Sequence, residues 1–374
     1  MGPFAHQGTP FPFEGPVPAE LLIDREQELT LLARRAGDRV NVRLVAPRRY
    51  GKTSLLLAHA DQLRATGWRT AHVDLSRVAD LADAARRLAV GYGQIDGGWI
   101  RAQLSGLLAR IGVALSAAGP SVQVAPRPPD PDVAAATTVV ERLLDLPLEL
   151  WRRDATPTLI VFDEFQDLLV AQRDLDGLLR SRIQYHGDAA AYVYAGSEPT
   201  VMRELFETRE RPFFAQADPM ALGPLPIEQV LTALAGRYER EQLDPGNALG
   251  ELVVFAAGHP QRTMLLAYLL ADRLLDGANA DALLAEEVIE AALVRVEPAY
   301  STLWHQLSAA ERIMLSAVAD GRAPTSRALA AEHKIARNTL NAAARRLAKQ
   351  GHLVLEPRAT RPVDPLLGEW LRRR

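Results

Sequence analysis

The chain has 374 residues, of which 48% are hydrophobic and 24% charged, with a formal net charge of −3. This length predicts two or three domains with a full core, and the near-neutral charge points to no particular class of partner. The absence of cysteine excludes disulfides, thiolate metal sites and a cysteine nucleophile. The first basic residue is Arg25 and no uncharged apolar run is long enough to span a membrane, so we expect a cytoplasmic protein without membrane contact.

The N-terminal elements predict an α/β fold. Residues 1–22 are rich in Pro, Gly and Phe and predict an extended arm. A helix is expected over 23–36, a strand over 40–45, a helix to about 66, a strand over 69–75 and a helix over 78–90. Because this order closes a βαβ unit, we predict a parallel sheet.

The turn between the first strand and its helix fits the phosphate-loop pattern G-x-x-x-x-G-K-[ST], with Ala46 in place of the first glycine. Successive backbone N–H groups would form an anion hole, Lys52 would neutralise β/γ-phosphate charge, and the Thr53 hydroxyl would ligate Mg²⁺. The alternative is an ordinary βα turn with a chance G-K-T. The predicted nucleotide-binding residues of this loop are Ala46, Pro47, Arg48, Arg49, Tyr50, Gly51, Lys52, Thr53 and Ser54.

Residues 97–154 are mostly helical in pattern, interrupted by a β-like segment at 122–124 and a polar, proline-rich run at 125–132. We interpret them as an insertion, because the strand that follows belongs to the same sheet. A flexible excursion at the prolines fits the pattern equally well.

That following strand, 158–162, ends in two carboxylates. Asp163, at the carboxyl edge of the sheet, would hold Mg²⁺ through water, and Glu164 would orient or deprotonate the attacking water. The alternative is an acidic strand exit that stabilises the next helix. A phosphate loop upstream favours the first interpretation, since two independent motifs then predict one site.

After a helix expected over 166–185, the strand 190–195 leads to Ser197. Its hydroxyl would reach the γ-phosphate or the attacking water, making Ser197 a catalytic candidate with Glu164 and Lys52. Helix N-capping is an equally good alternative, and one hydroxyl can do only one at a time. Arginine-finger candidates follow at Arg203, Arg209 and Arg211, although solvated arginines are commoner.

From residue 224 the pattern predicts helices only, at about 227–239, 248–257, 261–275 and 280–296. A helical subdomain beside a nucleotide site is a lid. In the joint between its second and third helices, Pro260 would contact adenine and Arg262 a phosphate. We assign His259 no chemistry beyond capping or solvation.

The last segment, 301–374, holds thirteen Arg or Lys against six Asp or Glu. Helices at 309–319, 326–332 and 336–350 followed by a β-wing predict a winged helix-turn-helix. Arg358 or Arg361 on the wing would touch DNA phosphate. The third helix is basic along one side, with Asn338, Asn341, Arg345, Arg346 and Lys349 as the predicted DNA-binding residues. Winged helices also bind proteins, so a protein partner remains the alternative.

The order of these motifs resembles the AAA+/STAND group of ATPases, and most closely the archaeal-type ATPase family. The resemblance rests on Ile23-Asp24-Arg25-Glu26, on P-R-R-Y-G-K-T-S-L-L, on V-F-D-E-F-Q-D-L and on the C-terminal Val363-Asp364-Pro365 with Trp370-Leu371-Arg372. It implies ATP and Mg²⁺ as cofactors, ATP hydrolysis, Ile23 near adenine, Ser197 as a sensor, and a homo-oligomer as one assembly state. Ala46 and the lack of a placeable arginine finger depart from the family pattern.

The implied domains are an arm (1–22), a P-loop ATPase core (23–222), a helical lid (223–300) and a winged helix-turn-helix (301–374). Two functions follow: an ATP-hydrolysing switch that acts on DNA, or a signalling or defence scaffold whose nucleotide state controls binding of a protein partner. A protein that binds nucleotide without hydrolysing it is a lesser third alternative. Salt-dependent duplex binding would favour the first.

Overall fold

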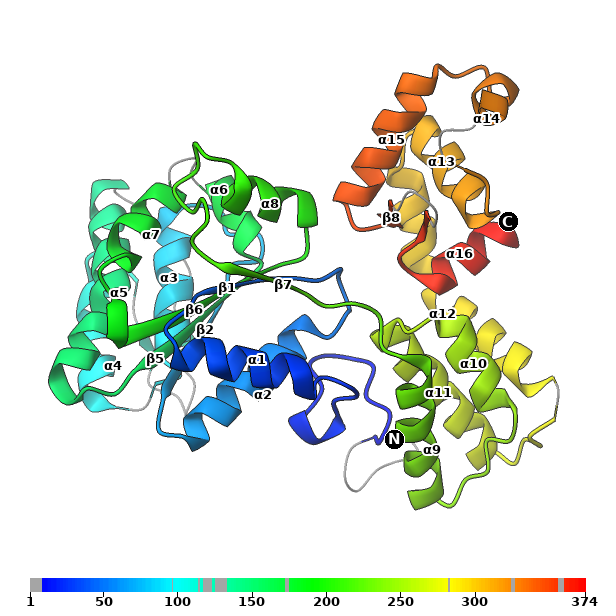
Figure 1. Cartoon of the computed structure of the whole chain (residues 1–374), viewed down its shortest axis with the longest axis horizontal. Coiled ribbons are helices and arrows are strands. Elements are labelled where there is room, and N and C mark those ends of the chain that lie inside the picture. Colours follow the sequence, from blue (N-terminus) through cyan, green and yellow to red (C-terminus); the bar gives the residue numbers. More distant parts are fainter. Residues whose placement is uncertain are drawn as a thin grey trace. The chain divides into compact units, whose positions relative to one another are not determined.

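Five strands pair into one sheet with the order β2-β5-β6-β1-β7, and every pairing is parallel (Figure 1). The strands are β1 (Val42–Val45), β2 (Arg69–Asp74), β5 (Thr158–Asp163), β6 (Ala190–Gly196) and β7 (Asp218–Ala221). The computed structural model describes residues 9–95, 97–113, 115–116, 123–124, 133–171, 175–281, 283–323, 327–355 and 360–374. β5 and β6 are buried along their whole length, as expected of central strands covered on both faces.

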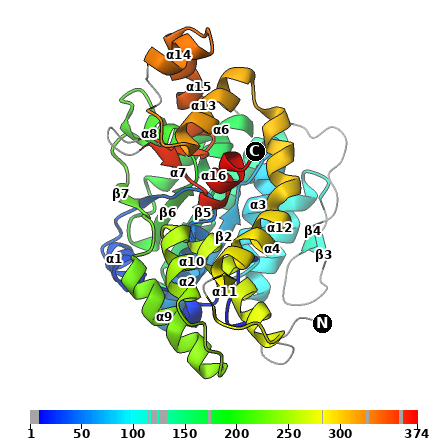
Figure 2. The same cartoon turned by 90° about the vertical axis from the view of Figure 1, so that its right-hand side faces the viewer.

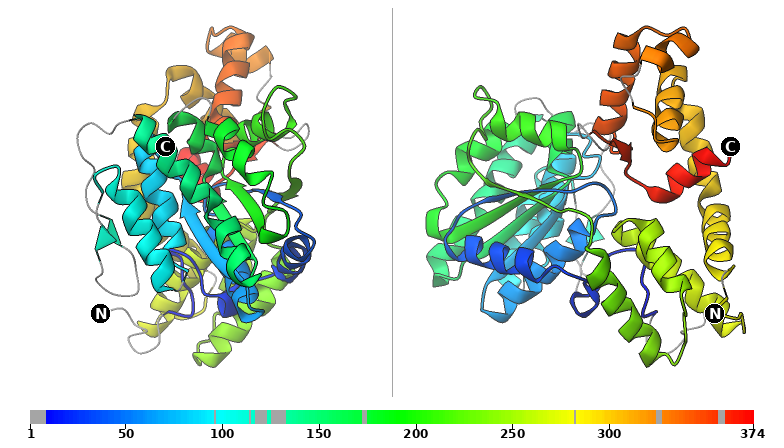
Figure 3. Two further views of the ribbon diagram at one scale, coloured as in Figure 1. Left: turned by 90° about the vertical axis from the view of Figure 1, so that its left-hand side faces the viewer. Right: turned by 45° about the vertical axis from the view of Figure 1, so that its right-hand side comes forward.

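Helices cover both faces of this sheet. α1 (Glu26–Gly37) and α2 (Lys52–Ala65) lie on one face, and α3 (Leu81–Tyr92), α5 (Val133–Asp154) and α7 (Leu175–Ile183) lie on the other (Figures 1 and 3). The remaining elements of this half are α4 (Gly98–Ala109), β3 (Leu115–Ser116), β4 (Gln123–Val124), η2 (Phe165–Asp167), α6 (Leu168–Ala171), η3 (Gly187–Ala189) and α8 (Pro199–Glu207).

An aromatic cluster fills the core on the α3 and α5 face. The ring of Tyr194 on β6 lies 4.8 Å from Phe165 and 5.1 Å from Phe213, measured between centroids. Phe162 on β5 stacks against Tyr194 at 6.0 Å. These rings anchor the segment that directly follows β5, and that segment carries the acidic pair.

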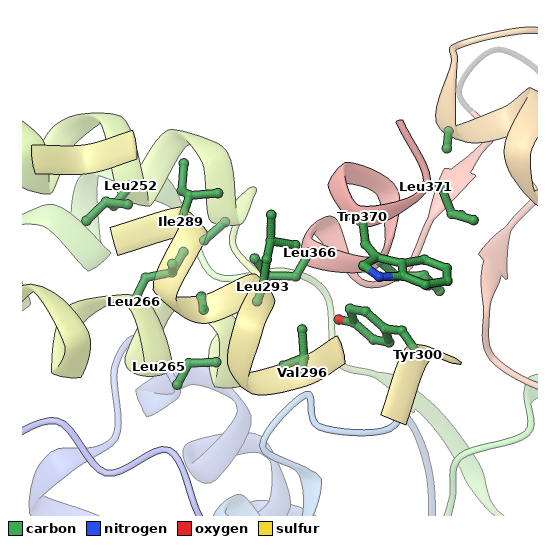
Figure 4. Close-up of a cluster of buried hydrophobic side chains, with 14 of the residues drawn as sticks. Leu252, Leu265, Leu266, Ile289, Leu293, Val296, Tyr300, Leu366, Trp370 and Leu371 are labelled. Carbon is green, nitrogen blue, oxygen red and sulfur yellow. The ribbon is translucent and has the colours of Figure 1, made fainter. Parts of the chain in front are cut away.

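The described part of the C-terminal half is helical, apart from one short pair of antiparallel strands. Its elements are α9 (Ile227–Arg240), α10 (Ala248–Ala256), α11 (Pro260–Leu275), α12 (Leu284–Gln306), α13 (Ala309–Ala319), α14 (Arg327–Glu332), α15 (Arg337–Lys349), β8 (Leu353–Val354), β9 (Arg361–Pro362) and α16 (Pro365–Arg372). Apolar side chains from α10, α11, α12 and α16 share one buried cluster (Figure 4).

Residue contacts divide the chain into two compact units. One unit holds Glu26–Ala46 and Leu55–Leu222, and the other holds Met1–Arg25, Pro47–Ser54 and Gly223–Arg374. The phosphate loop therefore groups with the helical unit, whereas the strands before and after the insertion group together as the sequence predicts.

The predicted boundary at 300/301 lies inside α12, which runs as one helix from the α9–α11 group to the α13–α16 group (Figure 2). The sequence predicts that this helix ends at 296, because proline usually ends a helix. The structure corrects this: Pro298 lies inside α12, and Tyr300 beyond it is buried in the same core. Burial of the following turn offsets the lost backbone hydrogen bond.

The described part of the N-terminal arm packs on the helical unit. Phe11 is fully buried, with its ring 4.6 Å from that of Tyr238 on α9. Arg237 donates hydrogen bonds to the carbonyl oxygens of Pro10 and Leu21, at 2.9 and 2.7 Å. Apart from η1 (Ala19–Leu21), residues 9–22 contain no helix or strand, as predicted.

Four of the five sheet strands were predicted, and β7 was missed. Its sequence, Asp218-Pro219-Met220-Ala221, lacks the β-branched residues that mark a strand. A proline is tolerated there because, in the described sheet, β7 is an edge strand next to β1. The range 166–185, predicted as one helix, contains η2, α6 and α7 instead. No described helix is long and apolar enough to cross a membrane.

His59 on α2 is a buried polar group with an expected effect on acid stability. Its side chain is fully buried, and within the described part of the chain neither ring nitrogen has a hydrogen-bond partner. Burial lowers its pKa from 6.5 to about 4. The folded state therefore favours the neutral ring. The contribution of His59 to the free energy of unfolding is fully present above its unfolded pKa and is lost as the pH falls from about 6.5 towards 4.

We predict that lowering the pH from 7.5 to 5 costs about 2 kcal/mol through His59 alone, by the linkage of its two pKa values. His59→Leu should remove this part of the acid sensitivity. The effect of carboxylate protonation on stability should be the same in the parent and the variant. Urea unfolding of the parent and the variant at both pH values measures the difference. Equal pH dependence of the two proteins would contradict the assignment.

Candidate active site

Three strands bring their carboxyl ends together at one edge of the sheet. β6 pairs with β5 on one side and with β1 on the other. The residues that follow these strands are Ala46, Glu164 and Ser197. The Ala46 N–H donates to the Gly196 carbonyl oxygen at 3.2 Å, so the start of the phosphate loop lies beside the end of β6. This is the edge where open α/β sheets bind ligands.

The phosphate loop contains two residues in the left-handed region. Arg49 has φ 67° and Gly51 has φ 78°, and α2 begins immediately afterwards at Lys52. Such turns point successive N–H groups to one side and form an anion-binding concavity at the helix start. Ala46 is buried and does not adopt positive φ, so this position needs no glycine. The departure from the motif is therefore sterically neutral.

The other loop residues make contacts within the helical unit. The ring of Tyr50 is buried, and its centroid lies 5.0 Å from that of His259 in an edge arrangement. Burial raises the Tyr50 pKa, opposed by the nearby Arg361 guanidinium. Ser54 accepts a hydrogen bond from the Val17 N–H at 2.9 Å. Among the other loop residues, Lys52 is buried, Pro47 and Thr53 are half-buried, and Arg48 and Arg49 are exposed.

The acidic pair ends β5 with an unusual backbone. Asp163 is buried, and its Oδ1 accepts the Glu164 N–H at 3.0 Å. Glu164 itself adopts φ 52° and ψ 45°, the left-handed region that non-glycine residues seldom occupy. Strain of this kind persists where surrounding structure fixes it and is concentrated at functional sites.

Two buried side chains hold the Glu164 carboxylate. The Ser197 hydroxyl and the Gln166 amide each donate to its Oε2 at 2.6 Å. Gly196 makes room for this arrangement, since an added Cβ would lie 2.6 Å from Gln166 Oε1. The helix-cap alternative for Ser197 is not observed: the N-cap of α8 is Glu198, without a side-chain cap bond. The sequence analysis does not predict Gln166 as a site residue. Its one sequence signal is its position two residues after the acidic pair, in D-E-F-Q.

At the joint before α11, His259 is the N-cap, and its Nδ1 accepts the Arg262 N–H at 3.3 Å, in agreement with the capping interpretation. Burial lowers the His259 pKa to about 4, so the ring is neutral near pH 7. Pro260 occupies the first turn of α11, and Ile23 is buried in the core of the helical unit.

Arg262 is almost fully buried and has carboxylate and hydroxyl partners. Its Nε donates to Asp364 Oδ1 at 2.9 Å, its Nη2 donates to the Tyr300 hydroxyl at 3.0 Å, and that hydroxyl donates to Asp364 Oδ2 at 2.7 Å. We call these three residues the Arg262 clasp. Burial raises the pKa of Asp364, but hydrogen bonds and charge from Arg262 outweigh it and lower the pKa below its usual range. The predicted phosphate contact of Arg262 stays a prediction, and here its guanidinium is bound by Asp364.

The donor set fits Mg²⁺ held with a nucleotide. Among the described residues no group of three or more His, Cys, Asp or Glu could hold a metal by itself. Mg²⁺ keeps several waters and uses one or two protein oxygens together with substrate phosphates. The Thr53 hydroxyl and the Asp163 carboxylate are oxygens of that kind, so the residues present suit this cofactor.

α15 presents polar residues on the side away from its core contacts. Leu340, Ala343, Ala344 and Leu347 are buried, whereas Asn338, Arg345 and Lys349 are exposed and Asn341 is half-buried. Arg346 differs, because its Nε lies 2.8 Å from Glu311 Oε1. Arg358 lies outside the described residues, and Arg361 lies close enough to Tyr50 for a side-chain hydrogen bond.

The arginine-finger candidates divide into two kinds. Arg203 and Arg209 are exposed. Arg211 is paired, with its Nη2 2.7 Å from Glu204 Oε1 and its Nη1 3.6 Å from Asp176 Oδ2. Arg211 is thus bound within its own unit.

The parallel sheet and the loop between β1 and α2 match the fold of P-loop ATPases, and solved structures agree. A Walker-type ATPase of Pyrococcus abyssi matches with a TM-score of 0.70 and 18% identity over 97% of this chain and 100% of that chain. The ORC2 protein of Aeropyrum pernix, solved as ADPNP-ADP complexes, matches with a TM-score of 0.62 and 17% identity. The match covers 97% of this chain and 96% of that chain. The ORC1 protein of the same organism, solved in complex with DNA, matches with a TM-score of 0.52 and 15% identity. The match covers 94% of this chain and 93% of that chain. No family model matches the sequence, and none of the curated proteins matches it.

We predict that Asp364→Ala destabilises the folded chain by about 3 kcal/mol, because it leaves the Arg262 guanidinium buried without its carboxylate. The double variant Arg262→Met, Asp364→Leu removes both charges and should recover most of this loss. Denaturant unfolding of the parent, Arg262→Met, Asp364→Leu and the double variant forms the thermodynamic cycle. Additive losses from the two single changes would contradict the coupling.

Proposed function

We propose that the chain binds ATP with Mg²⁺ through the loop after β1 and hydrolyses it with the acidic pair after β5. The observation that carries this proposal is the loop geometry: two left-handed residues followed by a helix that starts at Lys52. Glu164 has a left-handed backbone, and its carboxylate accepts two hydrogen bonds. Both features support a catalytic role for this residue at the end of β5. The fold shared with a Walker-type ATPase adds support.

Each residue has a distinct role in this proposal. Lys52 neutralises phosphate charge, and the loop N–H groups bind phosphate oxygens. Mg²⁺, when bound through Thr53 and Asp163, withdraws charge from the phosphates. Glu164 orients the attacking water and accepts its proton. The single Ser197 hydrogen is donated to Glu164, so Ser197 acts on water through the carboxylate and not directly on the γ-phosphate.

We further propose that α13, α14, α15 and the β8–β9 hairpin form a winged helix that binds duplex DNA. The exposed side chains of Asn338, Arg345 and Lys349 on α15 favour this role. The excess of basic residues over 301–374 supports it. The ORC1 structure with DNA is a precedent for a DNA complex in this fold.

A nucleotide-controlled scaffold that binds a protein partner is the second candidate. It is favoured by Tyr50, since a phosphate-loop residue that contacts Arg361 on β9 gives the C-terminal segment a direct connection to the nucleotide loop. Under this candidate, duplex binding is absent or independent of salt.

Two variants in one experiment test ATP hydrolysis. Lys52→Ala should lose high-affinity ATP binding, because the bound triphosphate then lacks its point charge from the side chain. Glu164→Gln should bind ATP as the parent does yet lower the turnover rate at least tenfold, since an amide cannot accept the proton. Calorimetric titration gives affinity, phosphate release gives turnover, and Lys349→Ala is the matched control. Parent-like ATP affinity in Lys52→Ala would disprove the site.

DNA binding is tested by removing two exposed charges from α15. The double variant Arg345→Ala, Lys349→Ala should weaken duplex binding and reduce the salt slope of the log-log plot by about two units if both contact phosphate. Arg240→Ala, Arg273→Ala removes the same charge from exposed positions on α9 and α11 and is the control. Fluorescence anisotropy at three salt concentrations measures both. If the parent does not bind DNA, or if α15 and control variants bind alike, the scaffold candidate replaces this one.

A further inference from the structure

His72 lies beside the acidic pair on an edge strand. It belongs to β2, which lies at the edge of the described sheet and pairs there with β5. The His72 Nε2 lies 3.5 Å from Asp163 Oδ2, and the His72 side chain is only 12% exposed. No feature of the sequence singles out this residue, because a histidine within R-T-A-H-V-D-L reads as an ordinary strand position.

The backbone of His72 is fixed from the open side of its strand. Its N–H donates to Gln94 Oε1 at 3.2 Å, and its carbonyl accepts from Gln94 Nε2 at 3.1 Å. One side-chain amide thus satisfies both backbone groups that the edge would leave unpaired. Gly91 on α3 adds a steric constraint, since a Cβ there would lie 2.9 Å from the His72 carbonyl oxygen. The imidazole therefore projects from a rigid base.

The surroundings of the ring select its tautomer. Nδ1 is buried and has no hydrogen-bond partner among the residues that the structure describes. A neutral imidazole carries one N–H. With the hydrogen on Nε2, the Nε2–H donor faces the Asp163 carboxylate, and the group without a partner is the Nδ1 acceptor. The other tautomer would bury an unpaired N–H and set the Nε2 lone pair against a carboxylate, so we assign the hydrogen to Nε2.

We propose that His72 is a positioning residue for Asp163, and this rests on the proposed role of Asp163 towards Mg²⁺. Asp163 Oδ1 accepts the Glu164 N–H, and His72 Nε2 faces Oδ2, so each carboxylate oxygen has a neighbouring group that can orient it. The present separation exceeds an ordinary hydrogen bond by about 0.5 Å, and such contacts tighten when a site is loaded. Groups that orient a metal-binding carboxylate commonly contribute 10- to 100-fold in metal affinity.

The test measures binding and does not require turnover. ATPγS is titrated calorimetrically into the full chain in EDTA and at increasing Mg²⁺. His72→Leu should raise the Mg²⁺ concentration for half-maximal affinity about tenfold or more while leaving the affinity in EDTA unchanged. His72→Gln, which keeps an N–H donor near the position of Nε2, should restore the parent midpoint. Asp163→Asn gives the size of the full effect, and His305→Leu, at an exposed position, is the matched control.

Two results would overturn the proposal: a parent-like Mg²⁺ midpoint in His72→Leu, or equal midpoints in His72→Leu and His72→Gln. If His72→Leu does not fold, His72→Asn replaces it, because its shorter amide cannot reach Asp163 and should behave as Leu does. A parent that shows no Mg²⁺-dependent ATPγS binding would overturn the proposed ATPase function itself, a distinct outcome from a failure confined to His72.

Discussion

The parallel pairing of β5, β6 and β1 is the constraint on which the candidate chemistry depends. Parallel strands place all their carboxyl ends at one edge, so the phosphate loop, the acidic pair and Ser197 leave the sheet from neighbouring positions although they are far apart in sequence. Complete burial of β5 and β6 on both faces holds this register, because a slip of one residue would disrupt the close packing of their side chains against the helices on each side. The geometry of the edge is therefore set by the core.

Glu164 shows how that rigid edge supports a strained residue. Its left-handed backbone costs free energy of order 1–3 kcal/mol, which the surrounding structure must offset. The aromatic packing of Phe165 and the two hydrogen bonds from Gln166 and Ser197 supply that offset. Because both donors address the same carboxylate oxygen, the side chain has one defined orientation. A general base gains rate from such fixed orientation.

Sequence reasoning succeeded where the signal is local. The turn between β1 and α2, the end of β5 and most helices follow from local spacing and capping, and the predicted parallel sheet is confirmed. It failed where the decisive partner is distant or the local signal is weak: β7 has an Asp-Pro start, and α12 continues past Pro298 because tertiary burial outweighs proline. Gln166 and His72 carry no pattern of their own and acquire meaning only from the side chains beside them.

The Arg262 clasp illustrates a limit of reading roles from motif position. Arg262 and Asp364 are 102 residues apart, and no periodicity connects them. A buried ion pair adds little net stability, yet losing one partner is costly, so the clasp fixes the approach of α16 to α11 and not the strength of the fold. With Nε and Nη2 both engaged by Asp364 and Tyr300, the guanidinium cannot offer a bidentate fork to a phosphate while the clasp is closed. A phosphate contact by Arg262 therefore requires that the segment following β9 first release it.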